Sequence, residues 1–462
     1  MNRRSATLFL LAATAFAHVG SPDIFLEGSA GPYPVFVTIR PPMVIPGVAE
    51  IEIRCSSPEV SQIRVTPTPL TGAGAKFAPT PDLMQRSNLD PQFFTGSLWM
   101  MAPGSWQVRV EADGAKGSGQ LSVPVPAVAT QTKPMQTAMA AILLVMTLVL
   151  ALGVVSIVGA SVREGSLAGG EPATGRSRNR ARILMGATAA LVVFILWAGD
   201  RWWIAEASSY SANLYKPLGM TAAIEPGDKL VLTIENSKWL RRRNDDFLPD
   251  HGHLMHLYVI AEPDANRAWH LHPDLSGSTF VENLPPMPAG RYKLYGDVVH
   301  ADGLAETMVA ELNLPHDLAG TALRGDDAAG VRGESPDGAH IEWVRDASPI
   351  KSRQASIFKF RLVDKNGKPV EDEELYMGML GHAAFVKNDG SVFAHVHPSG
   401  SVPMAALALA NPSQAEHMHM QPGLPPEADF PYGFPSPGNY RVIVQMKHAG
   451  IVETGIFDTV VE

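Results

Sequence analysis

The segment PAGRYKLYGDVVHADGLAETMVAELNL, residues 288–314, contains the pattern that decides the fold. A glycine, one further residue and an aromatic open an alternating run, and a hairpin leads to a last alternating run. Alternation of apolar and polar residues is typical of a half-buried β-strand. The segment SPGNYRVIVQMKHAGIVETGIFDTVV, residues 436–461, repeats this pattern, and APGSWQVRVEADGAKGSGQLSVPV, residues 102–125, resembles both.

These three segments indicate three copies of one domain. Other short alternating runs, such as VFVTIR, KLVLTIE and IFKFRLV, are bounded by Pro-rich and Gly-rich turns. We therefore predict a mainly β protein with tandem immunoglobulin-like β-sandwich domains and two transmembrane helices. The predicted order is a signal peptide (1–17), a first sandwich (18–126), a transmembrane helix (135–160), an Arg-rich cytoplasmic linker (161–182), a second transmembrane helix (183–203), a His-rich sandwich (215–316) and a His/Met-rich sandwich (337–462).

Two uncharged apolar blocks predict the membrane helices. Met135–Ala160 and Ile183–Gly199 are long enough to cross a bilayer, and tryptophans follow the second block at the expected interface. The start, MNRRSATLFLLAATAFA, has the features of a cleaved export signal. Five arginines against two glutamates in the linker place it in the cytoplasm by the positive-inside rule. We expect an inner-membrane protein whose N-terminal and C-terminal domains both lie on the periplasmic side.

Composition excludes several classes of partner and site. The formal net charge is −9, without a basic stripe, which argues against a nucleic-acid partner. The single cysteine, Cys55, excludes an intramolecular disulfide and a thiolate metal cluster, and we expect it to be a small buried apolar residue. The expected partners are the lipid bilayer and an unidentified protein that donates or accepts a metal.

Four histidines recur in register in the second and third copies. The matched pairs are His256 with His382, His270 with His395, His272 with His397, and His300 with His448. The first copy has Gly114 at the position of His300 and no counterpart of the others. The fold therefore forms without these histidines, which indicates a role other than packing.

The spacing in the third copy predicts that its histidines converge. Asp389-Gly390 is a dipeptide that type I′ hairpin turns prefer. A turn there makes His382 and His397 cross-strand partners, with His395 on the same face. We predict one site from His256, His270, His272 and His300 and another from His382, His395, His397 and His448. In the second site His448 supplies a fourth ligand or an outer contact.

Clustered neutral imidazoles need partners for their nitrogens, and a metal ion supplies them. The scarcity of thiolates and carboxylates argues against a zinc finger and against Ca²⁺ or Mg²⁺. Methionines indicate copper, because thioether favours Cu(I) and imidazole serves both oxidation states. Nickel and zinc remain open for the all-histidine set.

The methionines lie in two places. HGHLMH (251–256) and MGMLGH (377–382) share a frame, in which His251 and His253 correspond to Met377 and Met379. This exchange predicts a harder and a softer site, with an unselected loop as the alternative. The loop AEHMHM adds further candidate ligands, which are His417, Met418, His419 and Met420.

Cleavage after Ala17 would make His18 the mature amino terminus. Its free amine and imidazole Nδ1 can then chelate a metal together. His18 is therefore a further candidate ligand.

The HLHP motif at 270–273, AHVHP at 394–398 and the Gly-x-Tyr strand resemble the YtkA-like and FixH-like extracytoplasmic domains of bacteria, which occur in copper-related contexts. The first copy, with HVGSPD and PGSWQVRV, is similar to the copper-resistance CopC-like domains, whose amino-terminal histidine is a copper ligand. That resemblance implies a role for His18. The CopC-like pattern also has a further histidine, which is missing here, and an aspartate, for which Asp23 and Asp113 are candidates.

Three functions fit these observations. We favour a membrane-anchored extracytoplasmic protein that binds copper for buffering, resistance or delivery, without catalysis. The alternatives are a mononuclear copper enzyme that uses His18, and an interaction or assembly module of a membrane complex such as a respiratory complex.

Overall fold

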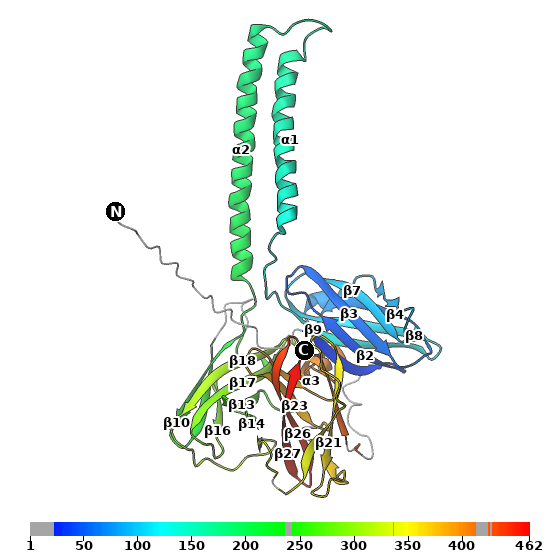
Figure 1. Ribbon diagram of the computed structural model, residues 1–462, viewed down its shortest axis with the longest axis vertical. Coiled ribbons are helices and arrows are strands. Elements are labelled where there is room, and N and C mark those ends of the chain that lie inside the picture. The colour runs from blue at the N-terminus through cyan, green and yellow to red at the C-terminus, as the bar shows by residue number, and fades with distance from the viewer. Residues whose placement is uncertain (1–22, 236–242, 336, 413–423, 426) are drawn as a thin grey trace, which may run out of the picture. The chain divides into compact units, whose positions relative to one another are not determined.

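The structure is a computed structural model that describes residues 23–235, 243–335, 337–412, 424–425 and 427–462. It has two compact units, one formed by the chain up to Thr130 together with Tyr215–Glu462, and the other by Gln131–Leu214. Antiparallel sheets and two long apolar helices make up these units (Figure 1). The predicted fold class, mainly β sandwiches with two such helices, is confirmed.

The unit Gln131–Leu214 contains helices α1 (Thr137–Glu164) and α2 (Gly175–Ala212). Both are long and apolar enough to cross a membrane. A side chain at Gly159 would place its Cβ 2.5 Å from the Sδ atom of Met185, so close packing of the two helices requires glycine there. Helix α2 extends beyond the predicted span 183–203 at both ends, and the linker arginines from Arg176 onward form its first turns.

The first copy has two sheets, with strand orders β1-β2-β3-β7-β6 and β5-β4-β8-β9. Cys55 is buried in this copy, as predicted. The strands are β1 (Ile24–Ala30), β2 (Tyr33–Arg40), β3 (Gly47–Cys55), β4 (Val60–Pro69), β5 (Asp82–Leu83), β6 (Gln85–Arg86), β7 (Phe93–Met100), β8 (Gly104–Gly114) and β9 (Gly117–Ala127), with a 3-10 turn at Ala73–Lys76.

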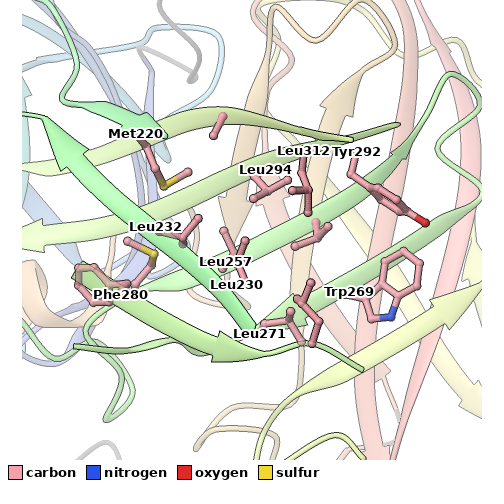
Figure 2. Close-up of a cluster of buried hydrophobic side chains, with 14 of the residues drawn as sticks. Met220, Leu230, Leu232, Leu257, Trp269, Leu271, Phe280, Tyr292, Leu294 and Leu312 are labelled. Atoms are coloured by element: carbon pink, nitrogen blue, oxygen red, sulfur yellow. The ribbon is translucent and has the colours of Figure 1, made fainter. Parts of the chain in front are cut away.

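The second copy packs the sheet β10-β11-β16-β15 against the sheet β12-β17-β13-β14-β19, with β18 beside β17. Figure 2 shows their shared core, where Leu230 and Phe280 of one sheet meet Leu257 and Leu294 of the other. The strands are β10 (Gly219–Glu225), β11 (Lys229–Glu235), β12 (Phe247–Leu248), β13 (His256–Glu262), β14 (Arg267–Leu271), β15 (Asp274–Ser276), β16 (Thr279–Asn283), β17 (Gly290–His300), β18 (Ala305–Leu314) and β19 (Ala328–Val331).

The third copy repeats this plan with the sheets β20-β21-β25 and β22-β26-β23-β24, and β27 pairs with β26. Phe25 of the first copy is buried in its core, beside Tyr432. The elements are β20 (His340–Val344), β21 (Ser356–Val363), β22 (Glu373–Glu374), β23 (His382–Lys387), β24 (Phe393–Val396), α3 (Met404–Ala410), β25 (Glu427–Tyr432), β26 (Gly438–His448) and β27 (Ile451–Val461).

The second and third copies meet through a separate apolar cluster between their sheets. In β13, Leu257 and Val259 point into the core of the second copy, whereas Tyr258 and Ile260 join this cluster. In the third copy, Ala384 of β23 and Phe393 of β24 belong to it. Because side chains alternate along a strand, one face of each sheet fills its own sandwich and the other face forms the contact between copies.

The predicted hairpin register between β23 and β24 is confirmed, since Ala383 pairs with Val396 and Ala384 with His395. The turn differs from the predicted type I′ turn. Only Gly390 of the Asp389-Gly390 pair has a positive φ, 70°, and its N–H donates to the Lys387 carbonyl. This is a type I turn closed by a left-handed glycine, which fits a loop longer than two residues.

Candidate metal centre

Eight histidines gather at the contact between the second and third copies. We call them the central histidine cluster, and the ring centroid of each lies within 6.0 Å of at least one other. Its members are His251, His253, His256, His270, His272, His382, His395 and His397. The cluster is therefore shared by both copies.

Strand alternation explains why these side chains meet. His256 begins β13 on the face that carries Tyr258, and His382 begins β23 on the face that carries Ala384. An HxH motif places both of its histidines on one face, and in each copy that face is the contact face. The predicted convergence of His382, His395 and His397 is found, with ring centroids 4.6–5.4 Å apart.

The first candidate site combines His256 and His270 of the second copy with His395 of the third. One ring nitrogen from each lies within 4.8 Å of the others. His256 Nδ1 and His270 Nε2 are 3.1 Å apart. Two ligands of one tetrahedral ion, each about 2.1 Å from the metal, lie roughly 3.4 Å apart, so this pair fits shared ligation.

The outer partners of these rings determine which nitrogens carry protons. The Asp250 carbonyl lies 3.1 Å from His256 Nε2, and Gln445 Oε1 lies 2.9 Å from His270 Nδ1. Both partners are acceptors, so each of these nitrogens donates its N–H. The Asp297 carboxylate lies 3.5 Å from His395 Nδ1 and favours a proton on that nitrogen in the same way.

The remaining nitrogens, among them His256 Nδ1 and His270 Nε2, then carry lone pairs that face one another. A neutral imidazole has only one N–H, so His256 has none left for His270. A cation between the lone pairs relieves the conflict, and the outer hydrogen bonds are those that hold metal-ligating histidines in orientation.

The second candidate site combines His251 of the second copy with His382 and His397 of the third, again within 4.8 Å. The Nε2 atoms of His251 and His382 are buried and have no hydrogen-bond partner among the described residues. His382 Nδ1 lies 3.1 Å from His395 Nε2, which connects the two sites. A buried ring nitrogen without a partner costs free energy that a bound metal would recover.

The HGH and MGM segments both form tight turns of the same type. Asp250 and His253 exchange two backbone hydrogen bonds, of 2.8 and 2.9 Å, and Tyr376 and Met379 exchange theirs at 2.7 and 3.1 Å. The first central residue of each turn, His251 or Met377, has φ 49°, followed by glycine with a positive φ. These are type I′ turns, in which asparagine is the preferred first residue. Residues other than glycine are uncommon in this left-handed conformation, although histidine is among the types enriched there.

The two turns also approach each other across the copies. The His251 ring forms a hydrogen bond to the Met377 backbone. Met377 and Met379 are half-buried. Among the described residues, no contact places the sulfur of Met377 or Met379 in either three-histidine site.

Burial keeps most of the cluster neutral. It is the largest cause of lowered pKa values, well below the ordinary value for His256, His270, His382 and His397, and neighbouring imidazoles lower them further. The pKa values of His251 and His272 are also lowered, mainly by burial. Neutral imidazole is the form that binds metals.

His253 and His272 form the outer edge of the cluster. Their rings stack with centroids 4.0 Å apart, and Asp326 and Asp327 lie 3.3 and 3.0 Å from His253 Nε2 and His272 Nδ1. Of the other candidates, His18 and the residues His417, Met418, His419 and Met420 lie outside the described residues.

The structure groups the histidines differently from the prediction. Each three-histidine site draws from both copies, whereas a four-histidine site within each copy was expected. His300 and His448 lie on the opposite face of the central strand, toward the core of their own sandwich, because their neighbours Val298 and Met446 belong to those cores. Strand alternation therefore separates them from the central histidine cluster.

Carboxylates surround these two histidines instead. Asp246 lies 2.8 Å from His300 Nδ1 and Glu306 lies 3.1 Å from its Nε2. Burial opposes the charge on His300, but these two hydrogen bonds raise its pKa overall. His448 meets Asp337 and Glu453.

Sequence reasoning missed the residues that orient the rings. Asp297 and Gln445 occupy the same repeat position, three residues before His300 and His448, and each contacts a histidine of the other copy. The Glu-Thr pairs at 306–307 and 453–454 are also matched. The repeat alignment contained both signals, but without the tertiary structure neither had a visible partner.

A family model matches the C-terminal part of the chain. Residues 334–462 match the family described as "Domain of unknown function (DUF8832)". No curated protein matches the chain.

Solved structures that match the chain include three adhesion proteins. A tetra-tandem repeat in the extending region of a large adhesion protein is 8% identical, with a TM-score of 0.16, and the match covers 95% of this chain and 82% of that one. A 1.5-MDa bacterial ice-binding adhesin is 6% identical, with a TM-score of 0.15 and coverages of 90% and 91%. The Escherichia coli adhesin FdeC is 10% identical, with a TM-score of 0.15 and coverages of 94% and 100%.

Proposed function

We propose that this chain is a membrane-anchored protein that binds copper between two extracytoplasmic β-sandwich domains and buffers or delivers it. The observation that carries this proposal is the set of proton positions in the first site. The Asp250 carbonyl and Gln445 Oε1 take the outer protons of His256 and His270, which leaves lone pairs facing each other 3.1 Å apart. A bound metal ion is the partner that fits this arrangement.

The donor set supports copper. Both sites are built from imidazoles, which suit copper, zinc and nickel, and Cu(II) is the tightest-binding divalent ion of its series. Asp297 contacts the outer nitrogen of His395, Nδ1, and is not a member of either three-histidine group. The resemblance of the HxHP motifs to YtkA-like and FixH-like domains, and of the first copy to CopC-like domains, adds support for copper over zinc.

The apolar helices and the arginines near their ends support an inner-membrane location with the sandwich domains on the periplasmic side. The two helices α1 and α2 each exceed the ~30 Å hydrocarbon core at about 1.5 Å per residue. Arg163 in the last turn of α1 and four arginines in the first turns of α2 favour a cytoplasmic location for these helix ends, and the three sandwiches would then lie outside the inner membrane. Among the described residues, no nucleophile or carboxylate occurs at matched positions beside both three-histidine sites, which favours binding or transfer over catalysis.

Copper binding by the full chain in detergent tests the proposal. We expect two copper ions per chain with affinities tighter than micromolar, and nitrogen splitting in the electron paramagnetic resonance spectrum of the Cu(II) form. His270→Ala and His382→Ala should each weaken binding by at least about tenfold. His340→Ala is the matched control, since His340 is exposed and lies outside the central histidine cluster. Equal copper binding by all four proteins would contradict the proposal.

A further inference from the structure

A second kind of site lies on the other side of β26, in the third copy. His448 is buried, and its Nε2 lies 3.3 Å from Asp337 Oδ2. The ligand atoms of Asp337, His448 and Glu453 lie within 4.8 Å of one another. For metal–oxygen bonds of about 2.1–2.4 Å, opposite ligands of an octahedral ion lie roughly 4.2–4.8 Å apart, so one ion can reach all three.

Buried carboxylate oxygens near His448 lack hydrogen-bond donors among the described residues. Glu453 is 2% exposed, and its Oε1 has no hydrogen-bond partner among the described residues. Both carboxylate oxygens of Glu373 are also buried without a hydrogen-bond partner among the described residues. Glu373 lies directly opposite His448 in the pairing of β22 with β26, so the two side chains share a face. Burial raises the pKa of Glu373 to about 7, and burial together with Asp337 raises that of Glu453 to about 7.

The second copy has matched residues around His300, and there the side chains are hydrogen-bonded to one another. Glu306 pairs with Val298 as Glu453 pairs with Met446, and Asp246 precedes β12 as Asp372 precedes β22. There both nitrogens of His300 have carboxylate partners. Glu306 also accepts hydrogen bonds from the Leu218 N–H and the Tyr215 hydroxyl.

The residue opposite the matched histidine also differs between the two copies. The residue opposite His300 is Phe247, whose ring lies 5.2 Å from the imidazole, whereas the residue opposite His448 is Glu373. The position that holds the Phe247 ring in the second copy therefore holds the Glu373 carboxylate in the third copy. In the third copy Asp337 and Asp372 lie 3.3 and 3.6 Å from the His448 nitrogens, but Glu453 Oε1 and the Glu373 carboxylate have no hydrogen-bond partner among the described residues.

We propose that His448, Glu453 and Asp337, with Glu373 beside them, bind a divalent cation that prefers oxygen ligands, with Mn²⁺ as the type. Carboxylates suit Mn²⁺ and one imidazole is compatible with it, whereas the all-imidazole central histidine cluster suits copper. This site is separate from the copper sites of the proposed function, and neither requires the other.

Mn²⁺ binding by the full chain in detergent, followed by electron paramagnetic resonance, tests the site. We expect one Mn²⁺ per chain, and at least about tenfold weaker binding in Glu453→Gln and Asp337→Asn. Glu306→Gln is the matched control in the second copy and should bind Mn²⁺ as the natural chain does.

Asp337 is exposed, so Asp337→Asn keeps the test decisive where Glu453→Gln fails to fold. Copper binding measured on the same Asp337→Asn protein should be unchanged, which separates this proposal from the proposed function. Absence of Mn²⁺ binding by the natural chain, or equal Mn²⁺ binding by Asp337→Asn, would overturn the inference.

Discussion

At the scale of single residues, proton positions decide what the central histidine cluster can bind. Gln445 Nε2 donates to Thr454 Oγ1 at 3.3 Å, which turns Oε1 toward His270 Nδ1. The amide thus fixes the tautomer of a histidine in the other copy. His395 has a second role, because its Nε2 also lies 3.1 Å from His382 Nδ1.

This double role predicts different copper stoichiometries for single substitutions. His395→Ala removes a ligand of the first site and the partner of His382 in the second, so we expect binding at both sites to weaken. His397→Ala and His270→Ala each remove a ligand of one site only. Copper per chain, measured by elemental analysis after gel filtration, should fall by about one ion in the latter two variants and by more in His395→Ala. An equal loss in all three would contradict the shared role of His395.

The lowered histidine pKa values predict that the metal-free chain loses stability in acid. The unfolded-state pKa is about 6.5 and the folded-state values lie below it, so the unfolded chain binds more protons as pH falls through 6.5. Stability from these groups is present above pH 6.5 and is lost below it. Each group contributes at most about 1.4 kcal/mol per pH unit. The thermal midpoint of the chelator-treated chain should therefore fall between pH 7.5 and 5.5.

Three groups act in the opposite direction. The pKa values of Glu373 and Glu453 are raised to about 7, so their protonation favours the folded state as pH falls through 7. The raised pKa of His300 stabilises the fold below about pH 6.5, and this contribution is lost as pH rises through the folded-state value. The double variant Glu373→Gln, Glu453→Gln should therefore show a steeper fall of the midpoint. A midpoint that rises on acidification of this double variant would be inconsistent with a neutral, buried cluster.

At the scale of elements, the two type I′ turns show what the chain retains and what it exchanges. The backbone of HGH and of MGM is the same, with a left-handed first residue at φ 49°. A preference of Cu(I) for thioether is not needed to explain why histidine in one turn corresponds to methionine in the other. The imidazole of His251 belongs to the candidate site with His382 and His397 of the third copy. A left-handed residue other than glycine or asparagine costs of order 1 kcal/mol, and both His251 and Met377 carry this cost.

Substitution by asparagine separates turn stability from metal binding. His251→Asn places the preferred residue in the turn, so the metal-free thermal midpoint should stay equal or rise, whereas copper binding at the second site should weaken by at least about tenfold. Met377→Asn makes the same change in the other turn without removing an imidazole and should leave copper binding at that site intact. Copper titrations and thermal melts of both variants would check this, and equal copper loss in both would contradict the assigned role of His251.

At the scale of the whole sandwich unit, the second and third copies form an internal pseudo-twofold pair. His270 of the second copy contacts Gln445 of the third copy. The matched residue His395 of the third copy contacts Asp297 of the second copy. Contacts related in this reciprocal way are typical of twofold interfaces between identical subunits. Here one chain supplies both halves, so the metal sites do not depend on protein concentration.

The apolar part of this contact should control both copper sites together. Phe393 stacks on Tyr295 with ring centroids 4.4 Å apart, and both side chains are buried. Phe393→Asp buries an unpaired charge there, so we expect the copies to separate and copper binding to be lost at both sites, although every histidine remains. Ile357→Asp is the control, because Ile357 is 55% exposed. Copper stoichiometry and far-ultraviolet circular dichroism would check the outcome, and full copper binding by a folded Phe393→Asp protein would contradict it.

The sequence by itself determined the strands, the membrane helices and the three repeats, because each depends on local periodicity and on uninterrupted apolar length. It also determined that His382, His395 and His397 share a face, since hairpin register and alternation are local. The tertiary structure alone decided which faces meet. His300 and His448 were left outside the central histidine cluster because a sheet has two faces, and sequence matching does not distinguish the core face from the contact face. Sites shared between copies, and ligand-orienting residues such as Asp297 and Gln445, arise from packing between domains that are distant in the chain.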